Sequence, residues 1–358
     1  MKKLLIPIFS VFALLSCSDE GVSPSNKTVA LKNENQASQL DIGPVNPFVW
    51  TKLTVPQMSS YPFNGPNGSN LIIPVGNDVY CLIAGAYEVV YKLNTHTKLW
   101  EPFSDPYQMY LPFAVGHQYL FSYQSKFYYG FRSDAGDEDY VTSLDPVTGQ
   151  RGNVPRFPGI PVSGPACFSL GTKGYIVGGR SNASGNVVNQ FWEIDFITNQ
   201  WTDRGTVPGG ARADALAFMI NNKVYYGLGY DYINFNGQKI KRLKDDWYSF
   251  DPTVSGGFAA VKADFPGTNR NQPKGFTINN KVYFGWGWTG QPGDLSYLTD
   301  FWEYNPDTNT WTQKPSCPAT TVDFDNVNVF AYGNAGYLVK GWLAQYWRYS
   351  SSSFVPTN

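Results

Sequence analysis

Short runs in which apolar and polar residues alternate recur along most of the chain. Alternation with a period of two predicts β-strands, because successive side chains of a strand point to opposite faces of a sheet. The clearest runs, Lys223–Gly229 and Lys281–Gly287, have nearly the same sequence, and each follows a tight turn that contains Asn. Another apolar run precedes each turn, so each pair reads as a β-hairpin. No long stretch has the 3.6-residue period of a helix, and the pattern therefore predicts an all-β protein.

The strands recur in units of roughly 50 residues, a period typical of repeat architectures. The segment Phe191–Thr202, with the pattern Phe-Trp-Glu…Trp-Thr, reappears as Phe301–Thr312. Each unit has an anchor residue that is followed, in most units after seven residues, by Trp or a weaker substitute. The anchor pairs are Leu93/Trp100, Leu144/Arg151, Ile194/Trp201, Phe250/Phe258, Tyr304/Trp311 and Tyr349/Phe354. The second strands of the units are Asp78–Gly85, Ser125–Phe131, Lys173–Gly179, Lys223–Gly229, Lys281–Gly287 and Gly336–Gly341. Together with the strand before each turn and the strand after each anchor, the pattern predicts six units of four strands.

The order of strands and marker residues in each unit resembles that of the kelch family, whose signature is a double glycine, then an aromatic residue, then Trp seven residues later. Gly178 and Gly179 with Ile194 and Trp201 are the best match. The resemblance covers about residues 70–356. It implies a six-bladed kelch-type β-propeller, with four-stranded antiparallel blades around a central channel. We assign residues 47–358 to this single domain.

The last unit lacks a clear fourth strand, and two segments could supply it. Residues 50–53, Trp-Thr-Lys-Leu, read as an isolated fourth strand near the N-terminus. If this strand joined the last blade, it would close the ring and leave no exposed sheet edge. Residues 354–357 near the C-terminus are the alternative.

The N-terminus has the features of a secretory signal. Two lysines precede an apolar run that ends at residue 15 and is too short to span a bilayer. The run continues into Ser16 and Cys17, which resembles a bacterial lipoprotein signal; an ordinary signal peptide is the alternative. Residues 18–21 resemble the acidic export signal of surface lipoproteins of the Bacteroidota. We therefore expect residues 1–16 to be the signal peptide, Cys17 to carry the lipid, and the polar residues 17–46 to form a flexible tether. The expected location is the outer membrane, exposed at the cell surface.

Charge and cysteine content exclude several classes of function. The chain has 27 basic and 28 acidic residues, a net charge of −1, so we expect no nucleic-acid partner. Its only two histidines, His96 and His117, are not spaced as metal ligands, and we expect neither a metal nor a cofactor. The remaining cysteines, Cys81, Cys167 and Cys317, are expected to be inert thiols in strands and the approach to the last unit. The one basic run, residues 239–244, reads as a solvated loop, with anion binding as the alternative.

Candidate binding residues come from the long, variable connections, which the kelch resemblance places on one face of the propeller. Variable loops on a rigid frame are where binding residues usually lie. Arginine offers a planar donor fork for carboxylates or sugar hydroxyls, and exposed aromatic rings can stack on sugars. For Tyr230, Tyr232 and Trp288 we expect exposure, whereas Trp286 and Trp342 have packing between blades as an equal alternative. The candidates are Arg180, Arg212, Asp214, Arg270, Tyr230, Tyr232, Trp286, Trp288 and Trp342.

Two functions are compatible with these features. The first is a non-catalytic surface lipoprotein that binds a glycan or an outer-membrane protein partner through the loop face, as an accessory of an uptake or assembly complex. It is favoured by the predicted lipid anchor and by the lack of any recognisable catalytic motif. The alternative is a cofactor-free sugar mutarotase or epimerase, similar to the kelch-type sialic acid mutarotase. That resemblance implies a carboxylate and an Arg in the channel, for which Asp214 and Arg212 are the nearest counterparts.

Overall fold

The computed structural model describes residues 48–53, 70–75, 78–84, 88–94, 100–102, 117–132, 139–254, 260–291, 294–318, 327–340 and 345–350. These residues form strands and turns without any helix, which confirms the all-β prediction. The chain divides into two compact units, and all described residues belong to the second, Asn46–Asn358. The predicted signal peptide, Cys17 and the tether lie outside the described residues, as do Trp342, Phe258 and Phe354. In the described part of the chain, no helix has the length and apolar character needed to cross a membrane.

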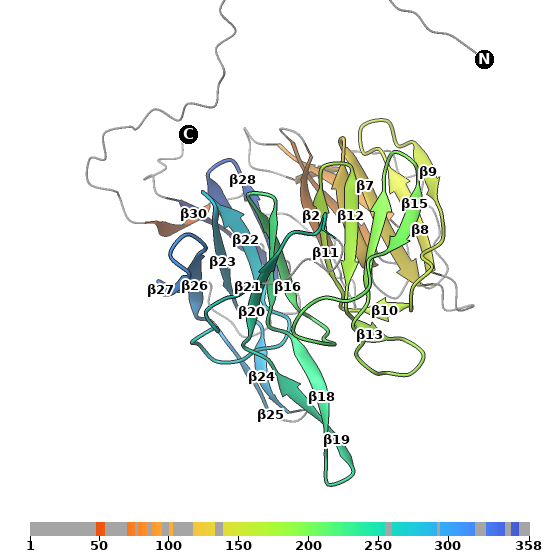
Figure 1. The fold of residues 1–358 in the computed structure, drawn as a ribbon. Helices are drawn as coiled ribbons and strands as arrows, with labels where there is room; N and C mark the ends of the chain where they lie inside the picture. The colour runs from red at the N-terminus through yellow and green to blue at the C-terminus, as the bar shows by residue number, and fades with distance from the viewer. Residues whose placement is uncertain are drawn as a thin grey trace, which may run out of the picture. The chain divides into compact units, whose positions relative to one another are not determined.

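The main strands form four-stranded antiparallel sheets, and six such sheets are present among the described residues (Figure 1). In sheet order, the strands of the first three sheets are β2 (Asn70–Val75), β3 (Asp78–Ala84), β4 (Glu88–Leu93) and β5 (Trp100–Pro102); β6 (His117–Tyr123), β7 (Lys126–Arg132), β8 (Asp139–Leu144) and β9 (Arg151–Val154); and β11 (Ala166–Leu170), β12 (Lys173–Val177), β14 (Phe191–Asp195) and β15 (Gln200–Asp203). Those of the other three are β16 (Leu216–Ile220), β17 (Lys223–Gly227), β20 (Trp247–Phe250) and β21 (Ala260–Val261); β22 (Lys274–Ile278), β23 (Lys281–Gly285), β26 (Phe301–Asn305) and β27 (Thr310–Lys314); and β28 (Val327–Tyr332), β29 (Ala335–Lys340), β30 (Gln345–Ser350) and β1 (Val49–Leu53). Neighbouring sheets meet through their first strands, for example β11 with β16 and β16 with β22. Radially arranged four-stranded sheets of this kind are the blades of a β-propeller.

The N-terminal strand joins the sheet formed by the C-terminal end of the chain. Strand β1 pairs antiparallel with β30, and Trp50 lies opposite Tyr349. The Nε1 of Trp50 donates a hydrogen bond to the carbonyl of Pro315 at 3.2 Å. Trp201 and Trp311 make the same kind of bond, to Pro155 and Ala263, at 2.8 Å each. Trp50 therefore takes the place of the repeat's Trp in the last blade, and the hypothesis that an N-terminal strand completes this blade is confirmed.

Three two-stranded sheets extend from the connections between the main strands. They pair β10 (Val162–Ser163) with β13 (Arg180–Ser181), β18 (Tyr230–Phe235) with β19 (Gln238–Leu243), and β24 (Trp288–Gln291) with β25 (Asp294–Tyr297). All three lie at the same end of the propeller, the lower end in Figure 1. The prediction of a solvated loop for residues 239–244 is wrong, because these residues belong largely to β19. Asn236 and Gly237, with φ angles of 51° and 77°, form the two-residue turn of this hairpin.

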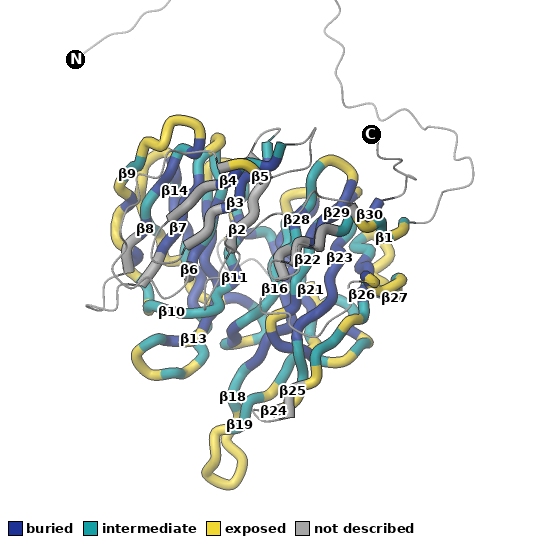
Figure 2. Tube along the Cα trace, turned by 180° about the vertical axis from the view of Figure 1, so that it is seen from behind, coloured by how far each residue is buried: buried dark blue, intermediate teal, exposed yellow. Residues whose placement is uncertain are grey.

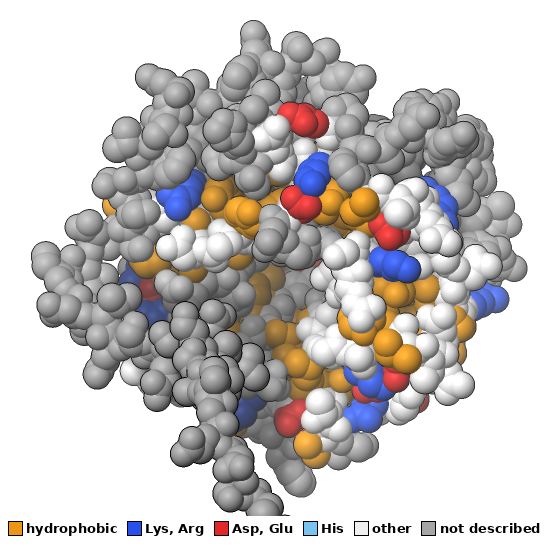
Figure 3. Space-filling view, turned by 90° about the horizontal axis from the view of Figure 1, so that it is seen from above, with side chains coloured by type: hydrophobic (Ala, Val, Ile, Leu, Met, Phe, Trp, Pro, Cys, Tyr) orange, Lys and Arg blue, Asp and Glu red, His pale blue; other side chains and the backbone are white. Residues whose placement is uncertain are grey.

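Buried residues occur along the strands of the blades (Figure 2). Most of the buried hydrophobic side chains are aromatic, and many of them pack between blades. Trp247, for example, contacts the rings of Tyr304 and Trp311 in the next blade. The repeated Phe-Trp-Glu motif adds a buried carboxylate to this packing: Glu303 accepts hydrogen bonds from Lys281 Nζ at 2.7 Å and from the Tyr283 hydroxyl at 2.9 Å. The end opposite the two-stranded sheets shows acidic and basic side chains interspersed, without a patch of one sign among the described residues (Figure 3).

Candidate functional site

The two predicted arginines of the fourth and fifth blades have the same structural role. Arg212 and Arg270 are fully buried. Arg212 donates to both carboxylate oxygens of Asp246, at 2.7 Å each. Arg270 does the same with Asp300, at 2.7 and 2.6 Å. These bidentate pairs leave little of either guanidinium for a ligand, in contrast to the selection of both arginines as candidate binding residues.

The arginines also stabilise the turn that replaces the double glycine of the repeat. Leu228 and Trp286 occupy the first glycine's position with φ angles of 59°, a conformation that costs free energy for residues with a side chain. Arg212 donates to the Leu228 carbonyl and Arg270 to the Trp286 carbonyl, at 3.2 Å in each case. In the third blade Gly178 takes this position with a φ angle of 64°, a conformation that glycine adopts without this cost.

Two predicted aromatic residues are buried. Trp286 is 2% exposed and packs against Trp50 and Phe301, which places it in the core between blades. Tyr230 is 6% exposed, so the expectation that it is exposed is wrong. Tyr232 and Trp288 are partly exposed.

Asp214 lies at the entrance to the inner strand of the fourth blade. Its φ angle of 53° is matched by Gly164 and Gln272 at the same position of the neighbouring blades, with 61° and 50°. Its backbone N–H donates to the Gly164 carbonyl at 2.8 Å. This turn directs the Asp214 side chain toward the space between the third, fourth and fifth blades. A Cβ atom added to Gly164 would lie 2.1 Å from the Asp214 carboxylate, so any other residue there would displace this carboxylate.

Asn271 of the fifth blade connects Asp214 to Lys241 of strand β19. Asn271 is 2% exposed. With its NH₂ group directed at Asp214, the amide donates to Oδ2 at 2.9 Å and accepts from Lys241 Nζ at 3.1 Å. The Lys241 ammonium lies 3.8 Å from the centre of the Tyr230 ring and 4.5 Å from that of Trp288. The lysine is thus held by two aromatic rings and one amide.

Burial shifts the pKa values of two groups in this cluster in opposite senses. Burial raises the pKa of Asp214 above its ordinary value, although Lys241, Lys274, the Asn271 hydrogen bond and Arg180 act in the other direction. Burial lowers the pKa of Lys241; the attraction of Asp214 opposes this shift, and Arg180 adds to it. An acid that retains its proton more readily, next to several cations, has the properties of a proton donor for an anionic ligand.

Side chains from three successive blades therefore form the cluster at this end of the propeller. Arg180, which is exposed, belongs to the third blade, Asp214, Tyr230 and Lys241 to the fourth, and Asn271, Lys274 and Trp288 to the fifth. The sequence predicted Arg180, Asp214, Tyr230 and Trp288 as binding residues and included Lys241 only in the basic run for which anion binding was the alternative, whereas Asn271 and Lys274 were not predicted. The alternation Tyr230-x-Tyr232 and Lys239-x-Lys241 around Asn236-Gly237 was the available signal for the hairpin, because it places these side chains on one face.

The cysteines take no part in this cluster. Cys81 and Cys167 are free thiols, and Cys317 is buried. Burial raises the pKa of the Cys167 thiol to about 12 and that of Cys81 further, so neither forms a thiolate nucleophile at neutral pH. Among the described residues, no three His, Cys, Asp or Glu side chains gather in a way that could hold a metal ion.

Comparisons with known proteins relate the chain to carbohydrate enzymes over part of its length. No family model matches the chain. It is 31% identical over 99 residues to the N-acetylneuraminate epimerase of Haemophilus influenzae strain PittEE, a match that covers 27% of this chain and 23% of that protein. It is 32% identical over 145 residues to the N-acetylneuraminate epimerase of Pasteurella multocida, covering 39% and 34% respectively. The matches thus span at most about a third of these relatives.

A solved structure described as the structure of YjhT has the same fold. The TM-score is 0.51 at 16% identity, over 69% of this chain and 83% of that one. The fold is thus a kelch-type β-propeller. The expectation of a non-catalytic binding function is wrong, because the sequence matches are to proteins named as epimerases.

Proposed function

We propose that this protein is a cofactor-free epimerase of N-acetylneuraminate or a similar acidic sugar, and that it interconverts the two configurations at the anomeric carbon. The observation that carries this proposal is the position of Asp214, a carboxyl group with a raised pKa where cationic side chains of three blades converge. The names of the partial sequence matches support the substrate class.

The reaction requires proton transfer rather than oxidation or group transfer. The anomeric hydroxyl loses a proton, the ring oxygen gains one, and the bond between the anomeric carbon and the ring oxygen breaks. The resulting open-chain ketone rotates and closes with its other face toward the same hydroxyl, so the protons return and the atoms balance. Asp214 donates and accepts the proton, since its raised pKa keeps the protonated form accessible. Asn271 orients this carboxyl group through its hydrogen bond.

The remaining residues of the cluster bind and orient the sugar. Lys241, Lys274 and Arg180 attract the sugar's carboxylate toward Asp214. The partly exposed ring of Trp288 offers a surface for the apolar face of the sugar ring. Arg212 remains a structural residue, because its two terminal nitrogens donate to Asp246 and to backbone carbonyls.

The test is anomer exchange of N-acetylneuraminate, followed by exchange NMR with the purified full-length chain. The wild type is expected to accelerate exchange, and Asp214→Asn to lose at least about a hundredfold of that acceleration, the usual contribution of a general acid or base. Asp307→Asn is the matched control, since Asp307 is exposed in a blade turn at the opposite end. If Asp214→Asn retained the wild-type rate, Asp214 would not be the proton donor. If the wild type did not accelerate exchange, the proposed activity would be refuted.

We further propose that the six sheets are the blades of one closed ring. The contacts of β28 with both β22 and β2, and of β2 with β6, support this closure.

From the N-terminal sequence we propose that Cys17 is lipidated and anchors the propeller to the outer membrane, exposed at the cell surface. Metabolic labelling with a fatty acid should label the wild type and leave Cys17→Ala unlabelled; label retained in the variant would refute the assignment.

A further inference from the structure

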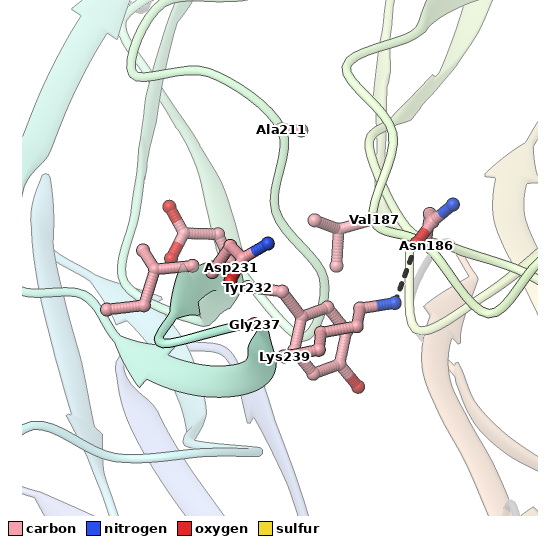
Figure 4. A pocket seen from close by; sticks show the side chains of 9 residues that line it. Asn186, Val187, Ala211, Asp231, Tyr232, Gly237 and Lys239 are labelled. Carbon is pink, nitrogen blue, oxygen red and sulfur yellow. Dashed lines mark hydrogen bonds between the residues drawn. The ribbon is translucent and has the colours of Figure 1, made fainter.

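A pocket of about 500 Å³ lies beside the cluster, between the β18–β19 hairpin and a loop of the third blade (Figure 4). Asn186 and Val187 line it from the third blade, and Tyr232, Asn234 and Lys239 from the hairpin; Ala211 completes it. Lys239 Nζ connects the two sides, with hydrogen bonds to the Asn186 side-chain oxygen at 2.6 Å and to the Gly185 carbonyl at 3.1 Å. The pocket therefore has a defined wall on each side.

One wall of the pocket is the free edge of strand β18. The N–H and C=O groups of Tyr230 both pair with Ala213, on the side of β18 that faces away from β19. Because these groups alternate in direction along an antiparallel strand, those of Tyr232 and Asn234 point to the same side. The segment that contains Ala211 does not continue this pairing in the described part of the chain, where no backbone bond is seen for either residue on that edge. The edge thus offers alternating donors and acceptors to the pocket.

The charges of the pocket favour a neutral ligand. The Lys239 ammonium is already bound by two oxygens and lies 4.1 Å from the centre of the Tyr232 ring. Asp231, also in the lining, is paired with Arg242 and Lys244. A group that can both donate and accept hydrogen bonds without carrying charge fits these surroundings, and a sugar hydroxyl is such a group.

Tyr232 belongs to both the pocket and the surroundings of the cluster. Its ring meets the Tyr230 ring edge-on, with centres 5.5 Å apart, and the Tyr230 ring also contacts Lys241. A ligand whose carboxylate lies near Lys241 can therefore extend past Tyr232 into the pocket.

We propose that this pocket binds the neutral polyhydroxyl chain that extends from the ring of a long acidic sugar, while its carboxylate lies in the cationic cluster. This inference rests on the proposed epimerase function and deepens it, because it makes the enzyme selective for acidic sugars with an exocyclic polyol chain. The open edge of β18 and Asn234 bind the hydroxyl groups, and Val187 and Ala211 contact the carbon chain.

The experiment compares two substrates in the NMR exchange assay: N-acetylneuraminate and the same acid with its exocyclic chain shortened by two carbons. With the wild type, the KM of the full-length acid is expected to be about tenfold lower, the effect of losing one or two hydrogen bonds. Ala211→Leu fills the pocket and is expected to raise the KM of the full-length acid by about tenfold while leaving the shortened acid unaffected. Val187→Phe fills the pocket from the other side and serves as a second variant in case Ala211→Leu does not fold.

The control variant is Ala260→Leu, at an exposed position of the outer strand β21. The inference is overturned if the wild type does not distinguish the two acids, or if filling the pocket affects both equally; either result leaves the epimerase function intact. If the wild type catalyses no exchange at all, the proposed function fails, and a binding measurement then tests whether the pocket holds the exocyclic chain. In saturation-transfer NMR, the exocyclic protons should then receive saturation from the wild type and lose it with Ala211→Leu, and an absent signal in the wild type overturns the pocket assignment too.

Discussion

Removal of the Asp246 carboxylate is expected to destabilise the fold strongly, because it leaves a buried guanidinium unpaired. The Arg212 side chain has 0% exposure and Asp246 23%. In Asp246→Ala, Arg212 loses two charge-assisted hydrogen bonds and retains those to the carbonyls of Leu228 and Gly209. Loss of one partner of a buried ion pair costs about 3–5 kcal/mol. Asp246 is partly exposed, so water can form some of the hydrogen bonds that its carboxylate made. We therefore expect the lower end of this range, about 3 kcal/mol.

A double variant separates the structural role of Arg212 from a catalytic one. Arg212→Met with Asp246→Leu removes both charges and retains apolar volume, so most of the stability lost in Asp246→Ala should return. Urea denaturation followed by tryptophan fluorescence gives the free energy of unfolding. Asp300→Ala, in the equivalent pair of the fifth blade, should show a loss of similar size.

Activity measurements provide the decisive result. The double variant is expected to retain anomer exchange, because Asp214, Asn271 and Lys241 are unchanged. A folded double variant without activity would refute the structural assignment and place Arg212 in contact with the substrate. A loss below about 1 kcal/mol in Asp246→Ala would refute the energetic argument, since that is the usual value of an exposed pair.

Three further variants test the fold and the charges of the site. Trp50→Phe removes the Nε1 bond to Pro315 and should cost about 1 kcal/mol in urea denaturation, as should Trp201→Phe; no loss for Trp50 alone would argue against its place in the last blade. Because burial raises the folded-state pKa of Asp214, the stability that this group contributes at acidic pH is lost as pH rises through that pKa. Asp214→Asn should therefore unfold at higher urea concentration than the wild type at pH 7, with the difference vanishing below the ordinary pKa of Asp; a less stable variant at pH 7 would contradict this. Glu303 behaves in the opposite way: burial raises its pKa, but hydrogen bonds from Lys281, Lys314 and Tyr283 outweigh this and lower it. Its contribution is present above the ordinary pKa of Glu and is lost as pH falls through the lowered value, so Glu303→Gln should be less stable at pH 7 and match the wild type in strong acid.

The requirements of the site and those of stability thus differ within one blade. Arg212 and Asp214 are two residues apart in the sequence, yet Arg212 points into the blade and Asp214 toward the neighbouring blades. The first stabilises a turn with an unfavourable φ angle, and the second holds a carboxyl group where burial disfavours its charge. We expect the buried carboxyl group to lower stability at neutral pH and to be retained for catalysis.

The repeat pattern was sufficient to predict the propeller, because the strands and turns of each unit are specified by residues within that unit. Period-two alternation, Asn-containing turns and the Trp after each anchor depend on residues close together in the chain. The Tyr304–Trp311 and Ile194–Trp201 pairs lie opposite each other in adjacent strands, as the spacing predicts. The missing strand of the last blade could also be predicted from the sequence, since Trp50 carries the pattern of a fourth strand without the first three.

The strand pattern and the β-propeller class could be predicted from the amino-acid sequence, because they follow from periodicity and turn chemistry within single units. The placement of the long connections at one end of the molecule was implied by the resemblance to the kelch family. Which polar residues of that end form the site could not be predicted, because it depends on how the blades pack. Arg212, Asp214 and Arg270 looked alike as candidates, but the direction of each side chain depends on the backbone turn and on partners in other segments, such as Asp246 and Asp300. Lys241 and Asn271 come within hydrogen-bonding distance of each other only because two blades pack side by side, and no local pattern in the sequence encodes that distance.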